Sequence, residues 1–299
     1  MPVASATKKV VLVTGGNSGV GFNASLTLAK TENTHVIVTG RNTERVQAAV
    51  DKIQAEAASS SVVEVGVLDL SSLKAIQEYA TKLKARGLKI DALVCNAGVA
   101  LTQKALTADG YEAVFGVNHL GHFYLVSLLR DVTRRVVVVT SEAHDPEEKA
   151  PVPLPNVSDL EQLAYGYEKY DPNEAYSTSK LGNLLLMNES LRRFPNGPEF
   201  LAYTPCFTPD TALLRELGDF VQTLVDGCRQ NGIPVNSSPA AGGFLARLAM
   251  DDLEANGWVN GTYFRMETPR LPSVQARDAE LGRAFWDKSE ELAERALRA

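Results

Sequence analysis

Tyr176 and Lys180 are the pair of side chains in this sequence whose spacing most directly suggests chemistry. Residues four apart share one face of a helix, so the two side chains lie close together if the segment is helical. A free tyrosine has a pKa of about 10, and a nearby ammonium lowers that pKa by favouring the phenolate. The pair is therefore predicted to move a proton to or from a carbonyl or alcohol oxygen. Because this spacing is common by accident, the interpretation depends on the motifs around it.

A glycine-rich turn near the N-terminus predicts an anion-binding site. Residues 14–21 read TGGNSGVG, and they stand between a short apolar run and a helical stretch. Backbone N–H groups and the helix dipole at such a turn attract a pyrophosphate, and glycine permits its close approach. An ordinary turn between a strand and a helix is the alternative. The predicted cofactor-binding residues of this turn are Gly15, Asn17, Ser18, Gly19, Val20 and Gly21.

The end of the second apolar run favours NADP(H) over NAD(H). A site that prefers NAD carries Asp or Glu about 20 residues after the glycines, where it binds the ribose 2′-hydroxyl. This sequence has TGRN at residues 39–42 instead. A carboxylate would repel a 2′-phosphate, whereas the guanidinium of Arg41 can bind it. The alternative is a solvated arginine that starts the next helix.

The segments that must position these residues alternate between strands and helices. Apolar, β-branched runs occupy residues 10–14, 34–39, 62–68, 92–95, 135–140, 198–204 and 261–265. Helical patterns occupy residues 19–30, 43–58, 71–86 and 110–129. Alternation of this kind indicates parallel βαβ units. The expected fold is α/β, a Rossmann-type doubly wound parallel sheet of about seven strands with helices on both faces, in a single domain over residues 1–299.

Two stretches interrupt the alternation. Residues 142–173 hold five prolines and several acidic residues, which predicts a long loop with one short helix, either a lid or disordered. Residues 211–239 read as an inserted helical segment, for which we favour a substrate lid. Residues 273–297 are expected to form a surface helix over the sheet.

The order of the motifs resembles the short-chain dehydrogenase/reductase superfamily over residues 8–249. The glycine turn has that family's Thr-Gly-x3-Gly-x-Gly spacing, and Tyr-x3-Lys follows at residues 176–180. Cys95 stands where the family usually has a second asparagine before its Asn-Ala-Gly motif. The other matching positions are Asp69-Leu70, Asn96-Ala97-Gly98, Asn118 and Ser141.

The resemblance implies a role for each matching position. The catalytic residues would be Asn118, Ser141, Tyr176 and Lys180. Ser141 would polarise the substrate oxygen, Asn118 would hold a water that relays protons toward Lys180, and Lys180 would also bind the nicotinamide ribose. The cofactor would further contact Asp69, Leu70, Asn96, Ala97, Gly98, Pro205 and Thr208, together with Tyr176 and Lys180.

Residues 118–123, NHLGHF, are similar to the branch that contains retinol dehydrogenases, protochlorophyllide reductases and WW-domain oxidoreductases. Phe285-Trp286 near the C-terminus is similar to that branch too. The likeness implies NADP(H) and a bulky apolar substrate. Two positions depart from the family, since Cys206 replaces the glycine after Pro205 and Asp210 replaces a threonine that contacts the nicotinamide amide. Thr208 and Thr211 flank that position.

Composition and the remaining motifs exclude other function classes. The formal charge of −6 and the lack of a basic stripe argue against nucleic-acid binding. No apolar run reaches the ~20 residues of a membrane span, and the N-terminus lacks the apolar core of a secretory signal. Three widely spaced cysteines fit a reducing, cytoplasmic setting. No metal site is expected at His119 and His122, and no hydrolase motif surrounds Ser141 and His144.

The sequence thus predicts an NADP(H)-dependent oxidoreductase that transfers a hydride between nicotinamide and a carbonyl or alcohol of a small apolar molecule. Two alternatives are a non-catalytic NADP(H)-binding regulatory protein and a light-dependent C=C reductase of the protochlorophyllide type. Compact members of the family form tetramers through the helix that carries Tyr-x3-Lys. Because the step from Ser141 to Tyr176 is longer here, a monomer or dimer is expected.

Overall fold

Eight strands form one sheet in the order β3-β2-β1-β4-β5-β6-β7-β8. The computed structural model describes residues 8–148, 150 and 152–298. Strands β1 to β7 pair in parallel, and β8 pairs antiparallel with β7 at the edge. The strands are β1 Lys9–Val13, β2 Thr34–Gly40, β3 Val62–Val67, β4 Ile90–Cys95, β5 Thr133–Val139, β6 Glu199–Thr204, β7 Tyr263–Arg265 and β8 Thr268–Arg270. The predicted doubly wound parallel sheet is therefore confirmed, with one antiparallel strand more than the seven expected.

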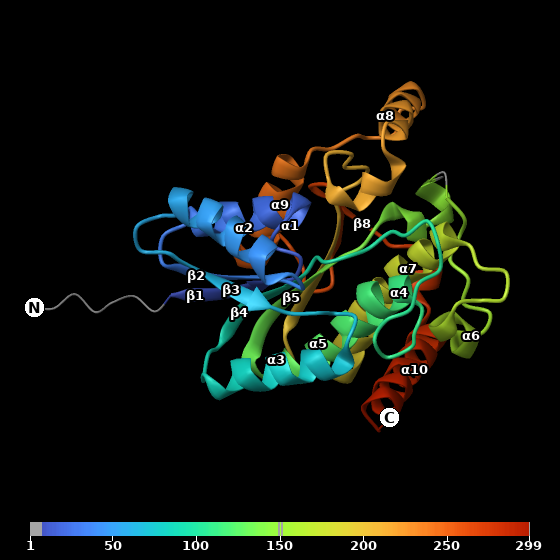
Figure 1. Cartoon of the computed structure of the whole chain (residues 1–299), viewed down its shortest axis with the longest axis horizontal. Coiled ribbons are helices and arrows are strands. Elements are labelled where there is room, and N and C mark those ends of the chain that lie inside the picture. Colours follow the sequence, from blue (N-terminus) through green and yellow to red (C-terminus); the bar gives the residue numbers. More distant parts are fainter. Residues whose placement is uncertain (1–7, 149, 151, 299) are drawn as a thin grey trace, which may run out of the picture.

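The central strands are apolar throughout because helices cover both faces of the sheet (Figure 1). In β1, Val10 and Leu12 point into one core, whereas Val11 and Val13 point into the other. Helices α1 Gly19–Ala29, α2 Thr43–Glu56 and α9 Ser238–Met250 supply the second core. Helices α3 Leu73–Ala85, α5 Gly121–Leu129, α7 Pro172–Arg193 and α10 Ala279–Arg298 supply the first.

The helix expected over residues 110–129 contains a local change of geometry. It begins as α4 Ala113–Phe115, widens into a π-helical turn over Gly116–Leu120, and continues as α5. Glu112 caps its start by accepting hydrogen bonds from the N–H groups of Val114 and Phe115. Single π-turns inside α-helices are frequent at functional sites, and this one carries Asn118.

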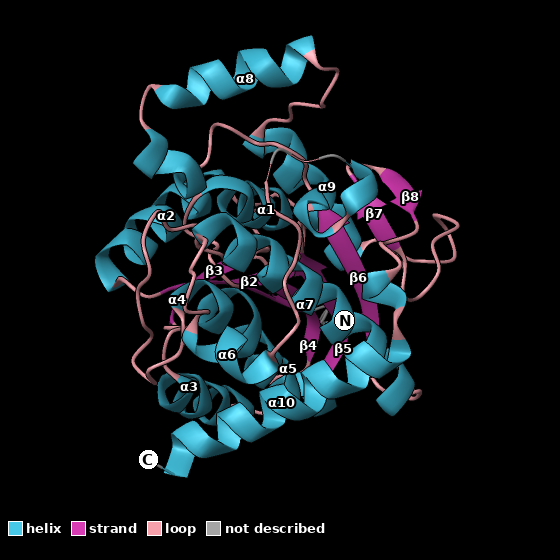
Figure 2. Ribbon diagram, turned by 90° about the vertical axis from the view of Figure 1, so that its right-hand side faces the viewer, coloured by secondary structure: helices cyan, strands magenta, loops and turns pink. Residues whose placement is uncertain are grey.

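The two stretches that interrupt the alternation hold short elements. Residues 142–173 contain two 3₁₀ turns, Glu142–His144 and Pro146–Glu148, and helix α6 Leu160–Tyr165. Residues 211–239 contain the 3₁₀ helix Ala212–Leu217 and helix α8 Phe220–Gln230. Helix α8 projects from one end of the molecule (Figures 1 and 2), and Phe220 at its start is exposed.

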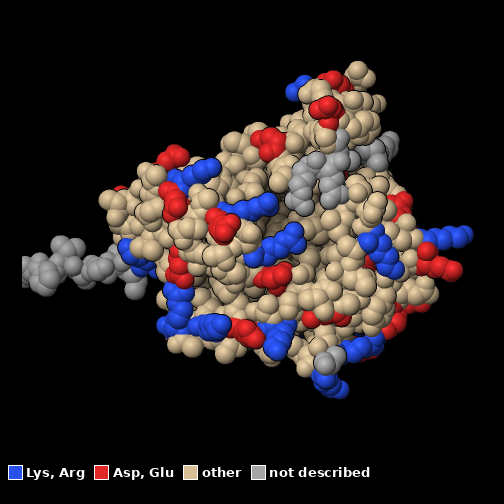
Figure 3. Space-filling model, in the orientation of Figure 1, with Lys and Arg blue, Asp and Glu red and all other residues tan. Residues whose placement is uncertain are grey.

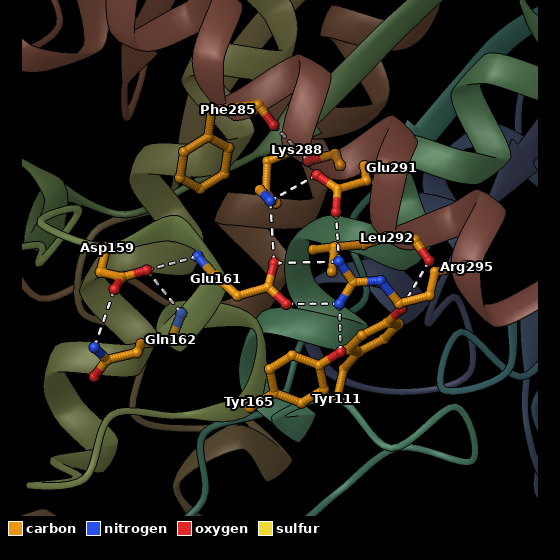
Figure 4. A network of polar contacts seen from close by, with 11 residues as sticks. Tyr111, Asp159, Glu161, Gln162, Tyr165, Phe285, Lys288, Glu291, Leu292 and Arg295 are labelled. Carbon is orange, nitrogen blue, oxygen red and sulfur yellow. Dashed lines mark hydrogen bonds and ion pairs between the residues drawn. The ribbon is translucent and has the colours of Figure 1, made fainter.

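Helix α10 packs against α7 through aromatic side chains and is joined to α6 by a polar network. Its aromatic residues Phe285 and Trp286 are buried, with the Trp286 ring edge-on to Phe123 at 4.9 Å between centroids. A polar network joins α10 to α6 (Figure 4). Glu161 accepts hydrogen bonds from Arg295 at 2.6 Å and Lys288 at 3.0 Å, and these cations lower the pKa of its carboxyl to about 2.

Within the described part of the chain, no helix is both long and apolar enough to cross a membrane. Nor do three or more His, Cys, Asp or Glu side chains gather there in an arrangement fit for a metal ion. Residues 1–7, for which the sequence predicts no secretory signal, lie outside the described residues. Cys95, Cys206 and Cys228 are free thiols, and all three are buried.

Candidate active site

The candidate site lies at the carboxyl ends of the central strands, where the strand order reverses between β1 and β4. In doubly wound sheets, ligands bind in the crevice at this switch point. The glycine turn follows β1, residues 96–98 follow β4, and Ser141 follows β5 by two residues. In Figure 3 this face is hollowed near its middle, and Lys and Arg side chains gather on one side of the hollow.

The glycine turn is packed too closely for larger residues at two positions. Gly15 has a φ of +61°, and a Cβ there would lie 3.0 Å from the Cα of Ala97. A Cβ at Gly21 would lie 2.4 Å from the carbonyl oxygen of Gly15. The side chain of Ser18, at the N-cap of α1, makes no capping hydrogen bond among the described residues. The anion site that the sequence predicts would use these first amides of α1, for which the Ser18 side chain does not compete.

Thr14 joins the glycine turn to the segment after β4. Its Oγ1 accepts hydrogen bonds from the N–H groups of Asn96 at 2.9 Å and Ala97 at 3.0 Å. The Asn96 amide donates in return to the carbonyl oxygen of Thr14 at 2.9 Å. Asn96 therefore fixes the turn through its side chain, and the predicted Asn-Ala-Gly segment forms one wall of the crevice.

The predicted adenosine end is more open. Arg41 follows β2 and is exposed, and a Cβ at the neighbouring Gly40 would lie 2.7 Å from Oδ1 of Asn17. Asn17 of the glycine turn therefore reaches the end of β2, next to Arg41. Asp69 accepts hydrogen bonds from both the N–H and the hydroxyl of Ser71, at 2.9 and 2.7 Å, through one carboxylate oxygen.

Asn118 is fully buried and held on both sides of its amide group. Its Oδ1 accepts from the N–H of Val99 at 2.7 Å. Its Nδ2 donates to the carbonyl of Val99 at 3.0 Å and to the hydroxyl of Ser179 at 3.1 Å. Ser179 lies on α7, between Tyr176 and Lys180 in sequence. Asn118 is thus attached directly to the helix that carries the predicted catalytic pair.

Helix α7 presents Tyr176 and Lys180 to the end of β5. The helix starts at Pro172 behind the cap of Asp171, whose carboxylate accepts from the N–H groups of Asn173 and Glu174. The Lys180 Nζ lies 5.4 Å from the centre of the Tyr176 ring and 3.4 Å from the carbonyl oxygen of Val139. A Cβ at Gly98 would lie 3.4 Å from both Lys180 Nζ and Asn118 Oδ1. The structure therefore brings the four predicted catalytic residues together.

Burial is the main cause of the pKa shifts of Tyr176 and Lys180. It raises the pKa of Tyr176 to about 12, although the Ser141 hydroxyl acts to lower it, and the Glu142 carboxylate raises it further. Burial also lowers the pKa of Lys180 to about 8. The sequence predicts that Lys180 lowers the pKa of Tyr176, and the tyrosine pKa is raised instead. The reason is that the ammonium faces the ring from 5.4 Å, while loss of hydration acts on the phenol directly.

The substrate side of the site carries a carboxylate and a strained cysteine. Glu142 accepts a hydrogen bond from the Thr204 hydroxyl at 3.0 Å. Cys206 is buried and has a φ of +62°, a region that favours glycine. The glycine that the family resemblance implies at this position would adopt this backbone conformation without strain. Burial, and then the Glu142 charge, raise the pKa of the Cys206 thiol to about 12, so it stays protonated.

Asp210, which stands where the family usually has a threonine, has a structural role. Its carboxylate accepts hydrogen bonds from the N–H of Ser238 at 2.9 and 3.0 Å and from the Ser238 hydroxyl at 2.9 Å. These bonds join the two ends of the segment 211–237. The Thr208 hydroxyl donates to the carbonyl of Cys206 at 3.0 Å, within its own turn. Thr211 is the residue that faces the glycine turn, since a Cβ at Gly19 would lie 3.2 Å from its methyl group.

Three residues of this region were not among the predicted site residues. Thr14 is the first residue of the glycine fingerprint, which was the available sign of its role. From the sequence, His122 is considered only as a metal ligand and His144 only beside a hydrolytic serine, and both roles are excluded. Both histidines are fully buried and hydrogen-bonded to main-chain atoms of the site. The available sign was spacing, since His122 is four residues from Asn118 and His144 is three residues from Ser141.

Comparison with known proteins identifies relatives of the whole fold. A family described as short chain dehydrogenase matches residues 9–148. The human WW domain-containing oxidoreductase is 36% identical over 302 residues, covering 97% of this chain and 69% of the relative. Human retinol dehydrogenase 13 is 31% identical over 296 residues, covering 97% and 86%. The crystal structure of an uncharacterized protein from Mycobacterium paratuberculosis aligns with a TM-score of 0.72 and 30% identity, covering 96% and 94%.

Proposed function

The chain belongs to the short-chain dehydrogenase/reductase family, in the branch that its motifs indicate, and we propose that it uses NADP(H) to reduce a carbonyl or oxidise an alcohol. Family membership makes it a nicotinamide-dependent oxidoreductase of the short-chain type. The observation that carries the finer proposal is the convergence of Asn118, Ser141, Tyr176 and Lys180 beside the glycine turn. The substrate we propose is a small apolar molecule.

The residues of the crevice fit a dinucleotide. The uncapped start of α1 and the tight glycines suit a pyrophosphate, and Lys180 is a buried ammonium whose contact with Val139 is long, at 3.4 Å. Such an ammonium has hydrogens to donate to ribose hydroxyls. Asn17 lies next to Gly40 at the end of β2, and we assign a 2′-phosphate to it and to the neighbouring, exposed Arg41. When bound, the cofactor supplies or accepts the hydride.

The chain's own residues handle the proton. With a pKa raised to about 12, Tyr176 holds its proton at neutral pH and can donate it to a carbonyl oxygen. The Ser141 hydroxyl, which faces the phenol, can donate a second hydrogen bond to the same oxygen and so stabilise developing negative charge. Asn118, bonded to Ser179 on α7, helps to hold the helix that carries Tyr176.

For the substrate, the region under α8 offers an open groove. It has a volume of about 800 Å³, and its lining includes none of the four proposed catalytic residues. Val221 and Val225 of α8 and Val235 give it apolar walls, while Asp210 and Arg229 add charge. We propose that residues 211–239 form the substrate lid, because they span this groove and Thr211 contacts the glycine turn.

A monomer or dimer is supported by helix α10. It packs along α7 and buries Phe285 and Trp286, so it covers part of the helix through which compact relatives associate. Residues 142–173, which the sequence predicts to cover this surface, contribute through α6, whose Glu161 binds Lys288 and Arg295 of α10. A tetramer found by light scattering at micromolar concentration would contradict the proposal.

The test of cofactor choice is fluorescence titration of the wild type and of Arg41→Ala with NADPH and NADH. A charge-assisted hydrogen bond contributes about 1.5–3 kcal/mol, so the variant should lose roughly 10- to 100-fold in NADPH affinity and little in NADH affinity. Lys52→Ala, an exposed cation on α2, is the matched control and should bind as wild type does. Equal losses for both nucleotides would refute the assignment of Arg41.

The test of chemistry is Tyr176→Phe. The variant keeps the ring and loses the proton donor, so it should bind NADPH normally and lose turnover of apolar aldehydes and ketones. Binding without turnover in both wild type and variant would favour a regulatory nucleotide-binding protein. Turnover that survives in Tyr176→Phe would remove Tyr176 from the mechanism.

A further inference from the structure

Two buried histidines lie behind the catalytic side chains, and we propose that they are positioning residues for the main chain of Asn118 and Ser141. His122 holds the carbonyl group of Asn118, and His144 holds the carbonyl group of Ser141. Each histidine is fully buried and ties its catalytic residue to a segment distant in sequence. The inference rests on the proposed function, because that function assigns Asn118 and Ser141 to the reaction.

The contacts of His122 determine its tautomer. Its Nδ1 lies 3.0 Å from the carbonyl oxygen of Asn118, which can only accept, so Nδ1 carries the hydrogen. In the neutral ring Nε2 is then an acceptor, and it lies 2.9 Å from the Thr14 hydroxyl. The Thr14 hydroxyl also lies 3.1 Å from the carbonyl oxygen of Val94. That oxygen already accepts the N–H groups of Thr14 at 2.9 Å and Asn96 at 3.0 Å, so we assign the hydroxyl hydrogen to the shorter contact with His122. Burial, and the Lys180 charge facing the ring, lower the pKa of His122 to about 4.

This arrangement connects the glycine turn to the π-helical turn that carries Asn118. Thr14 donates its hydroxyl hydrogen to His122 and accepts the N–H groups of Asn96 and Ala97 on its other side. His122 in turn donates to Asn118, which sits in the widened π-helical turn. A π-turn departs from the regular hydrogen-bond ladder, so a side-chain donor is an effective way to fix its carbonyl orientation. The position of the Asn118 amide is thereby linked to the end of β1.

His144 repeats the pattern at the end of β5. Its Nδ1 lies 2.6 Å from the carbonyl oxygen of Ser141, so Nδ1 carries the hydrogen here too. Its Nε2 accepts the N–H of Ser273 at 3.4 Å, and its ring meets Tyr263 edge-on at 5.5 Å. Burial lowers the pKa of His144, and Asp145 is the charge that faces it. Ser141 is thereby attached to the segment between β8 and α10.

His119 is a natural control within the same helix. It is as deeply buried as His122, and its Nε2 lies 3.0 Å from the hydroxyl of Ser289. When Ser289 donates its own hydrogen to the carbonyl of Phe285 at 2.8 Å, it accepts from Nε2 of His119, and Nδ1 of His119 faces Gly182 and Asn183. Its tautomer is therefore opposite to that of the other two, and its ring packs among Phe115, Phe123 and Phe285.

The first experiment is nitrogen-15 NMR of histidine-labelled protein, since the chain has four histidines and single variants assign each signal. We expect Nδ1–H for His122 and His144, Nε2–H for His119, and no change for His119 or His122 between about pH 6 and pH 8. An Nε2–H tautomer at His122 or His144 would overturn the proposal. This measurement needs neither turnover nor bound nucleotide, so it stands apart from the proposed function.

The second experiment is kinetic and uses graded replacements. His122→Phe and His144→Phe remove both ring nitrogens, whereas His122→Asn and His144→Asn keep an N–H donor near the Nδ1 position. Misplacement of a catalytic group can reduce the rate by about 10²-fold, so the Phe variants should lose kcat on that scale, with smaller changes in KM. The Asn variants should recover part of the loss, and His119→Phe should keep wild-type kcat.

The outcomes separate the two ideas. Folded Phe variants with unchanged kcat, judged by circular dichroism, would refute the positioning role while leaving the proposed function intact. Wild-type protein that shows the expected tautomers but no NADPH-dependent turnover would contradict the proposed function instead. If the Phe variants do not fold, the tautomers in the wild type decide the geometry and the Asn variants decide the kinetics.

Discussion

Replacing His119 with phenylalanine should make the protein markedly more resistant to acid. Burial is the main cause that lowers the pKa of His119 to about 3 and that of His122 to about 4. A histidine in the unfolded chain has a pKa of about 6.5, so the unfolded state binds more protons than the folded state below that pH. Stability therefore falls as pH falls from about 6.5 toward 4.

The size of the effect follows from the two shifts. At pH 5 an unfolded histidine is almost fully protonated, while His119 and His122 are still neutral, so each lowers the free energy of unfolding by about 2 kcal/mol relative to pH 8. The two together account for a loss of about 4 kcal/mol. This figure depends little on the folded pKa values as long as they lie well below 5.

Phenylalanine suits position 119 because the ring packs among Phe115, Phe123 and Phe285. The assay is urea unfolding at pH 8, 6 and 5, with the free energy of unfolding obtained by linear extrapolation. His119→Phe should lose about 2 kcal/mol less than wild type between pH 8 and pH 5. Ser289→Ala is the matched control, because it removes the hydrogen-bond partner of His119 but keeps the titrating ring. Equal pH dependence in His119→Phe and wild type would refute the reasoning.

Three further predictions concern other parts of the molecule. The rate of carbonyl reduction should fall as pH rises through about 8, where Lys180 loses its proton. In initial-rate profiles, Lys180→Arg should move that decline to higher pH. A decline at the same pH in both proteins would contradict this prediction. Cys206→Gly should change the free energy of unfolding by less than about 1 kcal/mol, because relief of the left-handed backbone offsets the lost burial. Cys206→Val should lower the free energy of unfolding by more than about 2 kcal/mol, because a β-branched residue is strained in this conformation. Urea unfolding compares the two variants, and equal stability would contradict the prediction. Arg295→Ala should lower the free energy of unfolding by no more than about 1 kcal/mol, because the ion pair with Glu161 is partly exposed. A larger loss in urea unfolding would contradict this prediction.

The sequence determined the architecture because its information is local. Each buried strand is a short apolar run, and helices α2, α3 and α7 carry their own capping side chains, so all seven predicted strands are found. The one strand it missed, β8, reads Thr-Pro-Arg, is fully exposed and has no apolar pattern. The glycine turn and the Tyr-x3-Lys spacing were equally readable, because both depend on neighbours in one turn or one helix.

The tertiary structure alone decided how the site is held and charged. Thr14 meets His122 across 108 positions, His144 meets Ser273 across 129, and Asp210 meets Ser238 across 28. No periodicity or spacing specifies such contacts, because they arise only when separate elements pack against each other. The pKa of Tyr176 follows the same logic. Spacing placed a lysine near it, but the loss of water on burial, which only the assembled fold sets, raised the pKa rather than lowering it.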